Sequence, residues 1–346
     1  MQYGDKILPL KSLRIFTSRS IQAMTVLGFT LCLLPAMSAQ AKTQLAASPF
    51  ETYVSDNGEP SRATDIVADA FRRAGVDVEL KIMRDAFLGS AVLTGKVDGE
   101  FAFIDLGKDK DDFLLSDIYL PIYLYALGKT SNVQNVQRFS HLKDNRVAIE
   151  NRFANTPNFS LLKEVKWSRN PSSFDAFKQL ADDRAPYLVT TALLATEFNK
   201  LLLNDNEELL HFSASPLATT GFQIALRKNV SNAKQFIDSF NAAIVDMQRQ
   251  GVMNQHLALE WLTKDIDGDG TADFIGHSSI THKNSELTGA YSLDGVPTSD
   301  ESHYYIDGKK FTSIKAVQDV LRQQPPINRQ LSLLDATTYK QLIQRW

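Results

Sequence analysis

The chain has 346 residues, of which 43% are hydrophobic and 22% are charged, a composition typical of a globular protein. This length is sufficient for two domains. The formal net charge is -3 at pH 7. An acidic balance argues against nucleic acid or an anionic membrane as the partner.

Residues 1–41 have the three parts of a secretory signal peptide. Four basic residues precede or flank an apolar stretch at 21–36, and "AQA" at 39–41 is a small-x-small cleavage site. The alternative is a membrane anchor, but the apolar stretch is short for a span of about 20 residues. The sequence therefore predicts cleavage and export to the periplasm.

Removal of this segment also removes the single cysteine, Cys32, so no disulfide can brace the exported chain. The remaining chain has 33 Lys and Arg residues against 39 Asp and Glu residues. It contains no second long apolar segment, and we expect a monomer that does not span the membrane. Its stability must come from a core, with a bound metal as a possible addition.

Strand-like and helix-like stretches alternate from residue 48 to about residue 261. "RATDIVADAFRRAGV" (62–76) predicts a helix with Thr64 as its N-cap and Gly75 as its stop. A strand over 76–83, a helix over 86–96 and a strand over 97–104 follow. This βαβ pattern predicts a parallel sheet with helices on its faces.

The same pattern recurs between residues 145 and 229, so the sequence predicts an α/β fold with two lobes. Small ligands bind preferentially in the cleft between such lobes. The expected boundaries are 45–127 plus 218–262 for lobe 1 and 128–217 for lobe 2. The helical stretch from residue 232 is expected to break near Gly251 and to continue as a shorter helix ending at Trp261.

Residues 263–346 are expected to form a small appended α+β module. "SHYYIDGKKFTS" (302–313) predicts a hairpin with Asp307-Gly308 at its turn. Ser313 and Asp335 are placed to cap two short helices at the C-terminus.

Several segments, in order, resemble family 3 extracytoplasmic solute-binding proteins, the binding components of polar amino acid ABC importers. The resemblance covers about residues 48–262, and its strongest pieces are "GKVDGEF", "LLSDIYLP" and "LALEW". It implies a two-lobed type II periplasmic-binding-protein fold that closes on a small polar solute. It also implies an inner-membrane ABC permease as partner.

The residues that hold an α-amino acid in this family are not matched here. Members usually place an arginine shortly before the segment that corresponds to "LLSD", and this chain has Lys108 and Lys110 there. Members also use an aspartate in a strand of the second lobe, where this chain has Thr190 and Thr191. These differences leave the expected fold unchanged but argue against an α-amino acid as the ligand.

The remaining candidates for the cleft are two aromatic walls, two arginines that favour an anionic group, and polar residues near the hinge. The predicted ligand-binding residues are Phe50, Tyr53, Arg84, Asp105, Tyr123, Arg152 and Thr191.

"DIDGDGTADF" (265–274) has the spacing of a calcium loop and resembles the loops of dockerins and thrombospondin type 3 repeats. Calcium binds six to eight oxygens, which such loops supply from alternate residues. The predicted ligands are the side chains of Asp265, Asp267, Asp269 and Asp273 and the carbonyl of Thr271. Gly276 replaces the glutamate that completes an EF-hand loop. We therefore expect a structural calcium ion at the join between lobe and module.

Two other functions stay open at this stage. A solute sensor acting on a signalling partner would have a nearly identical sequence. A dehydratase derived from the same fold would need a cleft carboxylate as general acid, for which Glu150 and Asp105 are candidates. No nucleophile motif or zinc-type spacing accompanies them, so the sequence favours a binding protein over an enzyme.

Overall fold

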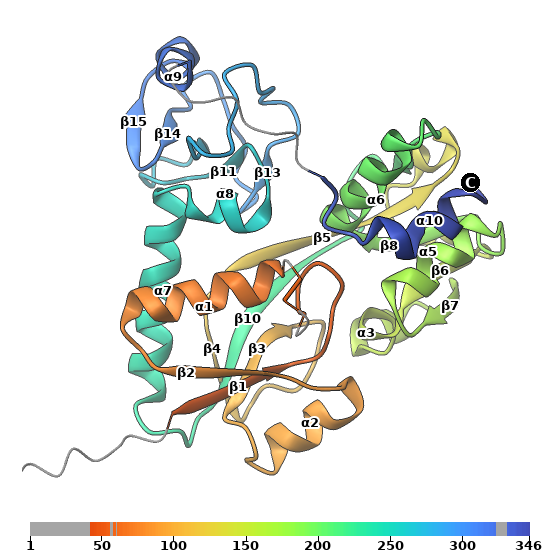
Figure 1. Ribbon diagram of the computed structural model, residues 1–346. Helices are drawn as coiled ribbons and strands as arrows, with labels where there is room; N and C mark the ends of the chain where they lie inside the picture. The colour runs from red at the N-terminus through yellow and green to blue at the C-terminus, as the bar shows by residue number, and fades with distance from the viewer. Residues whose placement is uncertain (1–41, 56–57, 60, 323–330) are drawn as a thin grey trace, which may run out of the picture. The chain divides into compact units, whose positions relative to one another are not determined.

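The structure is a computed structural model, and it describes residues 42–55, 58–59, 61–322 and 331–346. The predicted signal peptide lies outside the described residues. Lobe 1 combines a sheet with four helices, shown in Figure 1. Its strands are β1 (Thr43–Ala47), β2 (Val78–Ile82), β3 (Gly99–Ile104) and β4 (Phe113–Leu115). Its helices are α1 (Arg62–Ala74), α2 (Asp85–Leu93), α7 (Ala233–Arg249) and α8 (Val252–Leu257).

Helix α1 buries the apolar face that its sequence predicts and ends at Gly75, which has the left-handed φ of 66°. Its N-cap is Ser61 and not Thr64, so the predicted start is wrong. The backbone N–H groups of Arg62 and Ala63 donate to the carbonyls of Thr52 and Tyr53. Those carbonyls satisfy the free N–H groups of the first turn, and the helix therefore needs no side-chain cap.

Lobe 2 repeats the α/β pattern. Its strands are β6 (Arg146–Glu150), β7 (Lys166–Asn170), β8 (Tyr187–Thr191) and β9 (His211–Phe212). Its α-helices are α3 (Asn151–Ala154), α4 (Pro157–Ser160), α5 (Ser173–Ala181) and α6 (Ala192–Asn204), and two 3₁₀ turns, η1 (Ser131–Asn135) and η2 (Phe139–Leu142), precede them. Strand β6 pairs in parallel with both β7 and β8, as the alternating sequence predicts.

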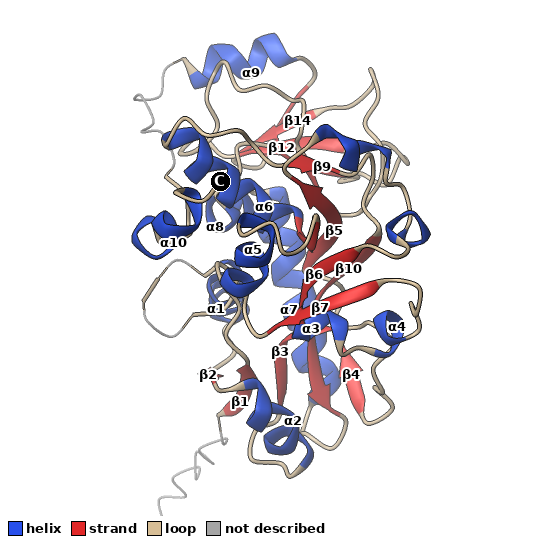
Figure 2. Cartoon of the chain, turned by 90° about the vertical axis from the view of Figure 1, so that its right-hand side faces the viewer, coloured by secondary structure: helices blue, strands red, loops and turns tan. Residues whose placement is uncertain are grey.

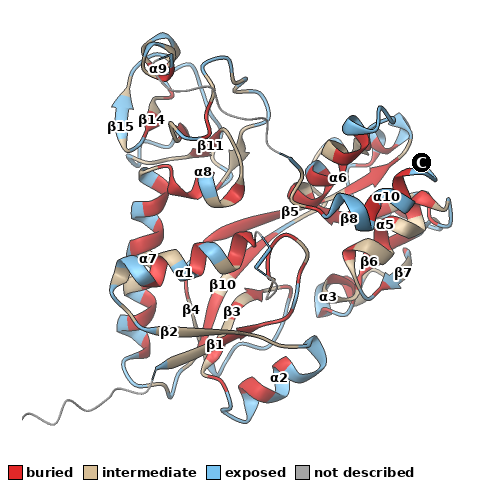
Figure 3. Ribbon diagram, viewed as in Figure 1, coloured by how far each residue is buried: buried red, intermediate tan, exposed pale blue. Residues whose placement is uncertain are grey.

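Two long strands join the lobes, β5 (Leu120–Gly128) and β10 (Ala218–Arg227). They pair with each other antiparallel, and Figure 2 shows them side by side. The sheet therefore continues from one lobe to the other in the order β2-β1-β3-β10-β5-β8-β6-β7. Both strands are mostly buried, as Figure 3 shows. The lobes therefore share one hydrogen-bonded framework, and β5 and β10 form the hinge strands.

A second sheet follows lobe 1 in the chain, with the order β13-β11-β12-β14-β15. Its strands are β11 (Leu262–Lys264), β12 (Asp273–Gly276), β13 (Tyr291–Ser292), β14 (Tyr304–Ile306) and β15 (Lys309–Phe311), and helix α9 (Ile314–Leu321) comes after them. The predicted hairpin is confirmed, because β14 and β15 pair antiparallel across Asp307 and Gly308, both with positive φ. The Ser313 cap is confirmed as well.

Helix α8 ends at Leu257, so the helix predicted to reach Trp261 is wrong. Ala258 is left-handed, with a φ of 59°. The fully buried Asn254 side chain donates to the carbonyls of Leu259 and Glu260. It thereby holds the chain in a turn instead of a further helical turn.

The C-terminal helix α10 (Ala336–Ile343) begins at the predicted Asp335 cap. It packs against α5 and α6 of lobe 2, as Figure 1 shows. Tyr339 is fully buried there, with ring centroids 5.3 Å from Phe174 and 5.8 Å from Phe198. Among the described residues, no helix has the length and apolar composition that a bilayer span requires.

Candidate functional site

A cavity of about 160 Å³ lies between the lobes and is lined by residues of both. Lobe 1 contributes the loop after β1, the start of α2, strand β3 and the loop that follows it. Lobe 2 contributes α3 and the turn that leads into α4. The polar and charged lining residues from lobe 1 are Ser48, Asp85, Glu100 and Lys108, and those from lobe 2 are Asn151, Arg152, Asn155 and Thr156. We refer to this cavity as the cleft pocket.

Glu100 is the most buried carboxylate of the cleft pocket, and it projects from the middle of the sheet in β3. Burial raises the pKa of Glu100, Lys108 lowers it and Asp85 raises it further, so that the net shift is upward. The ammonium group of Lys108 lies 5.2 Å from the centre of the Phe103 ring. Because Lys108 forms no direct ion pair with Glu100, the charge of this partly buried carboxylate is only partly compensated.

Arg152, a predicted ligand-binding residue, lines the cleft pocket and also connects the lobes. Its Nε donates to Glu150 at 3.2 Å, and its Nη2 donates to the carbonyl of Pro49 at 2.5 Å. Its guanidinium carbon lies 3.9 Å from the centre of the Phe50 ring, a cation–π contact. Glu150 also accepts a hydrogen bond from Ser173. The arginine is therefore held in place by groups of the protein itself.

Two further contacts join the lobes through residues that do not line the cleft pocket. The hydroxyls of Tyr53 and Thr191, both predicted site residues, are hydrogen-bonded at 2.8 Å. Burial is the main cause that raises the pKa of Tyr53 to about 12, so the hydroxyl keeps its proton at neutral pH. Both residues are fully buried and neither lines the cleft pocket, so they bind each other and not a ligand.

The second contact is a fully buried ion pair between Arg62 of α1 and Glu197 of α6, at 2.5 Å. Arg62 also donates to the side chain of Thr52 and to the carbonyl of Leu257. Glu197 accepts from Lys200 and from the backbone N–H of Leu333. Burial alone would raise the pKa of Glu197, but the cations and the N–H donor lower it overall. Other groups of the protein therefore form hydrogen bonds with both members of the ion pair.

The other predicted site residues lie elsewhere. Arg84 is exposed at the start of α2 and is not part of the cleft pocket lining. Asp105 forms an ion pair with Lys110. The Tyr123 hydroxyl donates to the carbonyl of Ser292, in strand β13 of the second sheet, at 2.9 Å. These placements give Asp105 and Tyr123 partners within the protein.

The sequence analysis did not single out Asp85, Glu100, Arg62 or Glu197. Glu100 stands in "GKVDGEF" and directly follows Gly99. The backbone at Gly99 lies so close to the carbonyl of Ala225 in β10 that a larger side chain there would clash with it. An acidic residue in an otherwise apolar strand was the available signal. Arg62 and Glu197 are 135 residues apart, and no local pattern relates them.

The aspartate loop lies between β11 and β12. Carboxylate oxygens of Asp265, Asp267 and Asp269 lie within 4.8 Å of one another. Both oxygens of Asp265 accept backbone N–H groups, from Gly268 and Gly270, and these glycines have φ of 78° and 87°. Three carboxylates at this spacing are the hard oxygen donors that calcium prefers, so the residues fit the predicted ion. Calcium binding stays a prediction.

The remaining two predicted calcium ligands differ in their surroundings. Asp273 is buried in β12 and accepts from the backbone N–H of His303 at 2.9 Å. The backbone N–H of Thr271 donates to Asp269. Lys310 forms an ion pair with Asp267 at 2.9 Å and lowers the pKa of that carboxyl. The loop is therefore partly neutralised by a cation of the hairpin.

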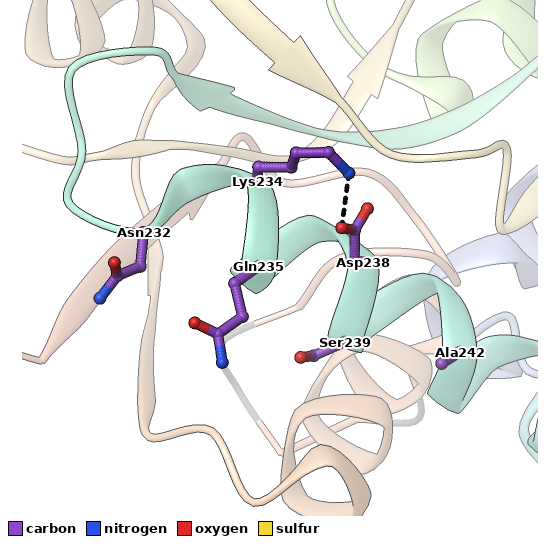
Figure 4. Close-up of a pocket in the computed structure, with 6 residues that line it drawn as sticks. All are labelled: Asn232, Lys234, Gln235, Asp238, Ser239 and Ala242. Carbon is purple, nitrogen blue, oxygen red and sulfur yellow. Dashed lines mark hydrogen bonds and ion pairs between the residues drawn. The ribbon is translucent and has the colours of Figure 1, made fainter.

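A second hollow lies along α7 and is lined by Asn232, Lys234, Gln235, Asp238, Ser239 and Ala242 (Figure 4). All six residues come from one helix or its N-cap. Lys234 and Asp238 form an ion pair at 2.7 Å on its solvent side. The hollow lacks the convergence of several elements that the cleft pocket has.

Known structures resemble this chain in fold. The GluR0 ligand-binding core in complex with L-glutamate matches with a TM-score of 0.52 at 12% identity, over 63% of this chain and 96% of that one. The fold is that of a two-lobed periplasmic binding protein. The GluR0 core from Nostoc punctiforme, also with L-glutamate, matches with a TM-score of 0.50 at 17% identity, over 62% and 96% of the two chains.

ArgBP from T. maritima is 21% identical over 62% of this chain and 93% of its own, with a TM-score of 0.49. The two GluR0 cores have the same fold as this chain, and the two-lobed type II fold predicted from the sequence is confirmed. No family model matches the chain. No characterised protein matches it by sequence.

Proposed function

We propose that this protein is an exported solute-binding protein that captures a small polar molecule in the cleft pocket. The observation that carries the proposal is a cavity lined by charged and polar groups of both lobes, in a fold whose lobes are joined by two hinge strands. A ligand that contacts both lobes stabilises the closed arrangement, because the open arrangement lacks half of those contacts.

The partner in this proposal is an inner-membrane ABC permease, as the resemblance to family 3 binding proteins implies. A sensor protein that responds to lobe closure is the alternative partner. Both partners require the same event, the closure of the lobes on a solute. Co-purification of the ligand-loaded protein with a permease from the membrane fraction supports transport, and co-purification with a membrane kinase supports sensing.

We further propose that the aspartate loop binds calcium and braces the second sheet. The support is the set of three clustered carboxylates together with the turn that Gly268 and Gly270 permit. Two hydrogen bonds connect the loop with hinge strand β5. The carboxylate of Asp294 accepts from the backbone N–H of Asp265, and the carbonyl of Ser292, two residues earlier, accepts from the hydroxyl of Tyr123. The proposed role is structural and involves no catalysis.

The test of the binding function is a thermal-shift screen against amines, amino acids, organic acids and sugars, followed by calorimetry of each solute that raises Tm. We expect at least one solute to bind with a stoichiometry of one. Small-angle scattering should show no expansion on binding, since the lobes are already in contact. If no solute raised Tm and none co-purified with the protein, the binding function would be refuted.

A further inference from the structure

We propose that the cleft pocket selects a small organic cation, a solute with an ammonium or guanidinium group, and that Glu100 and Asp85 hold this group. The inference rests on the proposed binding function and specifies its ligand. It differs from the anionic solute that Arg84 and Arg152 favoured in the sequence.

The carboxylates of the pocket lack counterions at contact distance. Neither Glu100 nor Asp85 forms a hydrogen bond or an ion pair through its carboxylate with any residue that the structure describes. Both come from lobe 1, one from β3 and one from the first turn of α2. Asp85 is exposed and Glu100 is partly buried. A partly buried carboxylate without a direct partner is unfavourable, and a bound cation would supply the missing charge. Two carboxylates beside one cavity give an ammonium group more than one acceptor.

The basic groups of the pocket, in contrast, already have partners or lie outside hydrogen-bonding contact with the carboxylates. Arg152 is bound by Glu150, by the Pro49 carbonyl and by the Phe50 ring. Lys108 is exposed and lies over the Phe103 ring. An anionic ligand would have to compete with Glu150 for Arg152 and would lie close to Glu100. The charge distribution therefore favours a cation at the lobe 1 end.

The size and the walls of the pocket limit the rest of the ligand. Its volume of about 160 Å³ is below the roughly 300 to 1,000 Å³ of pockets for drug-sized molecules. Phe50 and Val54 give one apolar wall, and Asn151 and Asn155 of lobe 2 face the same cavity. The ligand is consequently a short amine or guanidine with an apolar stem or a second polar end that the two asparagines can bind.

The experiment is calorimetry and thermal shift with six probes: butylamine, 1,4-diaminobutane, agmatine, butan-1-ol, butyrate and glutarate. We expect at least one of the three cations to bind, and the neutral and anionic probes not to bind. In Glu100→Gln the Kd of that cation should rise about 10- to 100-fold, the loss expected for a hydrogen bond to a charged group. Asp85→Asn should weaken binding in the same direction, and the double variant should abolish it.

Glu164→Gln is the matched control, because Glu164 is exposed on lobe 2 outside the pocket lining and the substitution removes the same charge. Its Kd should equal that of the unaltered protein. Glu100→Gln replaces a partly buried and only partly compensated charge by a neutral amide, so its Tm without ligand should not fall.

The outcomes separate this inference from the function on which it rests. If butyrate, glutarate or butan-1-ol bound and the cations did not, the cation preference would be overturned while the binding function stood. The same conclusion follows if a cation bound equally well to the Glu100→Gln, Asp85→Asn and unaltered proteins. If neither these probes nor the wider solute screen gave binding, both the inference and the function would be refuted.

Discussion

The buried ion pair between Arg62 and Glu197 leads to the sharpest stability prediction. Arg62→Met removes the charged partner of a fully buried carboxylate and also the donors to Thr52 and to the carbonyl of Leu257. Removing one member of a buried pair costs about 3 to 5 kcal/mol. Lys200 and the Leu333 N–H still bind Glu197, so the lower end of this range is expected. Urea unfolding of the variant measures the loss as a lower midpoint with an unchanged slope.

Two further variants test the cause of that loss. Arg62→Met combined with Glu197→Met leaves no buried charge, and its unfolding free energy should be higher than that of Arg62→Met alone. Lys234→Met breaks an exposed ion pair with Asp238, which should change the unfolding free energy by less than about 1 kcal/mol. If Arg62→Met cost no more than Lys234→Met, or if the double variant were the less stable of the two, the reasoning would be refuted.

Three other predictions follow from the second sheet and from Glu197. Tyr123→Phe and Tyr291→Phe each remove one hydrogen bond between that sheet and hinge strand β5. Each should lower the free energy of unfolding in urea by about 0.5 to 1.5 kcal/mol. Additive losses in the double variant would argue against coupling between the two tyrosines. Calcium should raise the Tm of the unaltered protein, and a chelator should reverse the rise. The double variant Asp265→Asn, Asp269→Asn should show neither effect. An equal shift of Tm in both proteins would contradict a calcium site in this loop. The pKa of Glu197 in the folded protein lies below its ordinary value of 4.5. Its contribution to stability is therefore present above pH 4.5 and is lost as the pH falls through the folded pKa. The stability of Glu197→Gln should depend less on pH over that range, and an unchanged midpoint of acid unfolding would contradict the shift.

The alternation of strands and helices could be predicted from sequence because each element carries a local signal. The buried face of α1, the Gly75 stop and the turn at Asp307-Gly308 all depend on residues within a few positions of one another. The Ser61 start of α1 and the Leu257 end of α8 could not be predicted in this way. Both depend on backbone groups that other segments satisfy, the carbonyls of Thr52 and Tyr53 in one case and the Asn254 amide in the other.

The candidate site was less accessible to sequence reasoning. Phe50 and Arg152 were predicted ligand-binding residues and do line the cleft pocket. Their contact with each other could not be predicted, because it joins segments about 100 residues apart in different lobes. Tyr123 was placed near the hinge, and its hydroxyl faces the second sheet. Which side of a hinge strand faces a cleft is decided by tertiary packing, for which the local pattern has no signal.

The contact between Glu197 and the backbone of Leu333 has a consequence for the order in which the chain can fold. Arg62 precedes Glu197 by 135 residues, and Leu333 follows it by 136. Beside its local partner Lys200, the buried carboxylate of lobe 2 therefore has partners in two segments that lie far before and far after it in the chain. Contacts between residues so distant in sequence form late and slow folding. The lobes and the segment around Leu333 should consequently gain their full stability together, and not lobe by lobe.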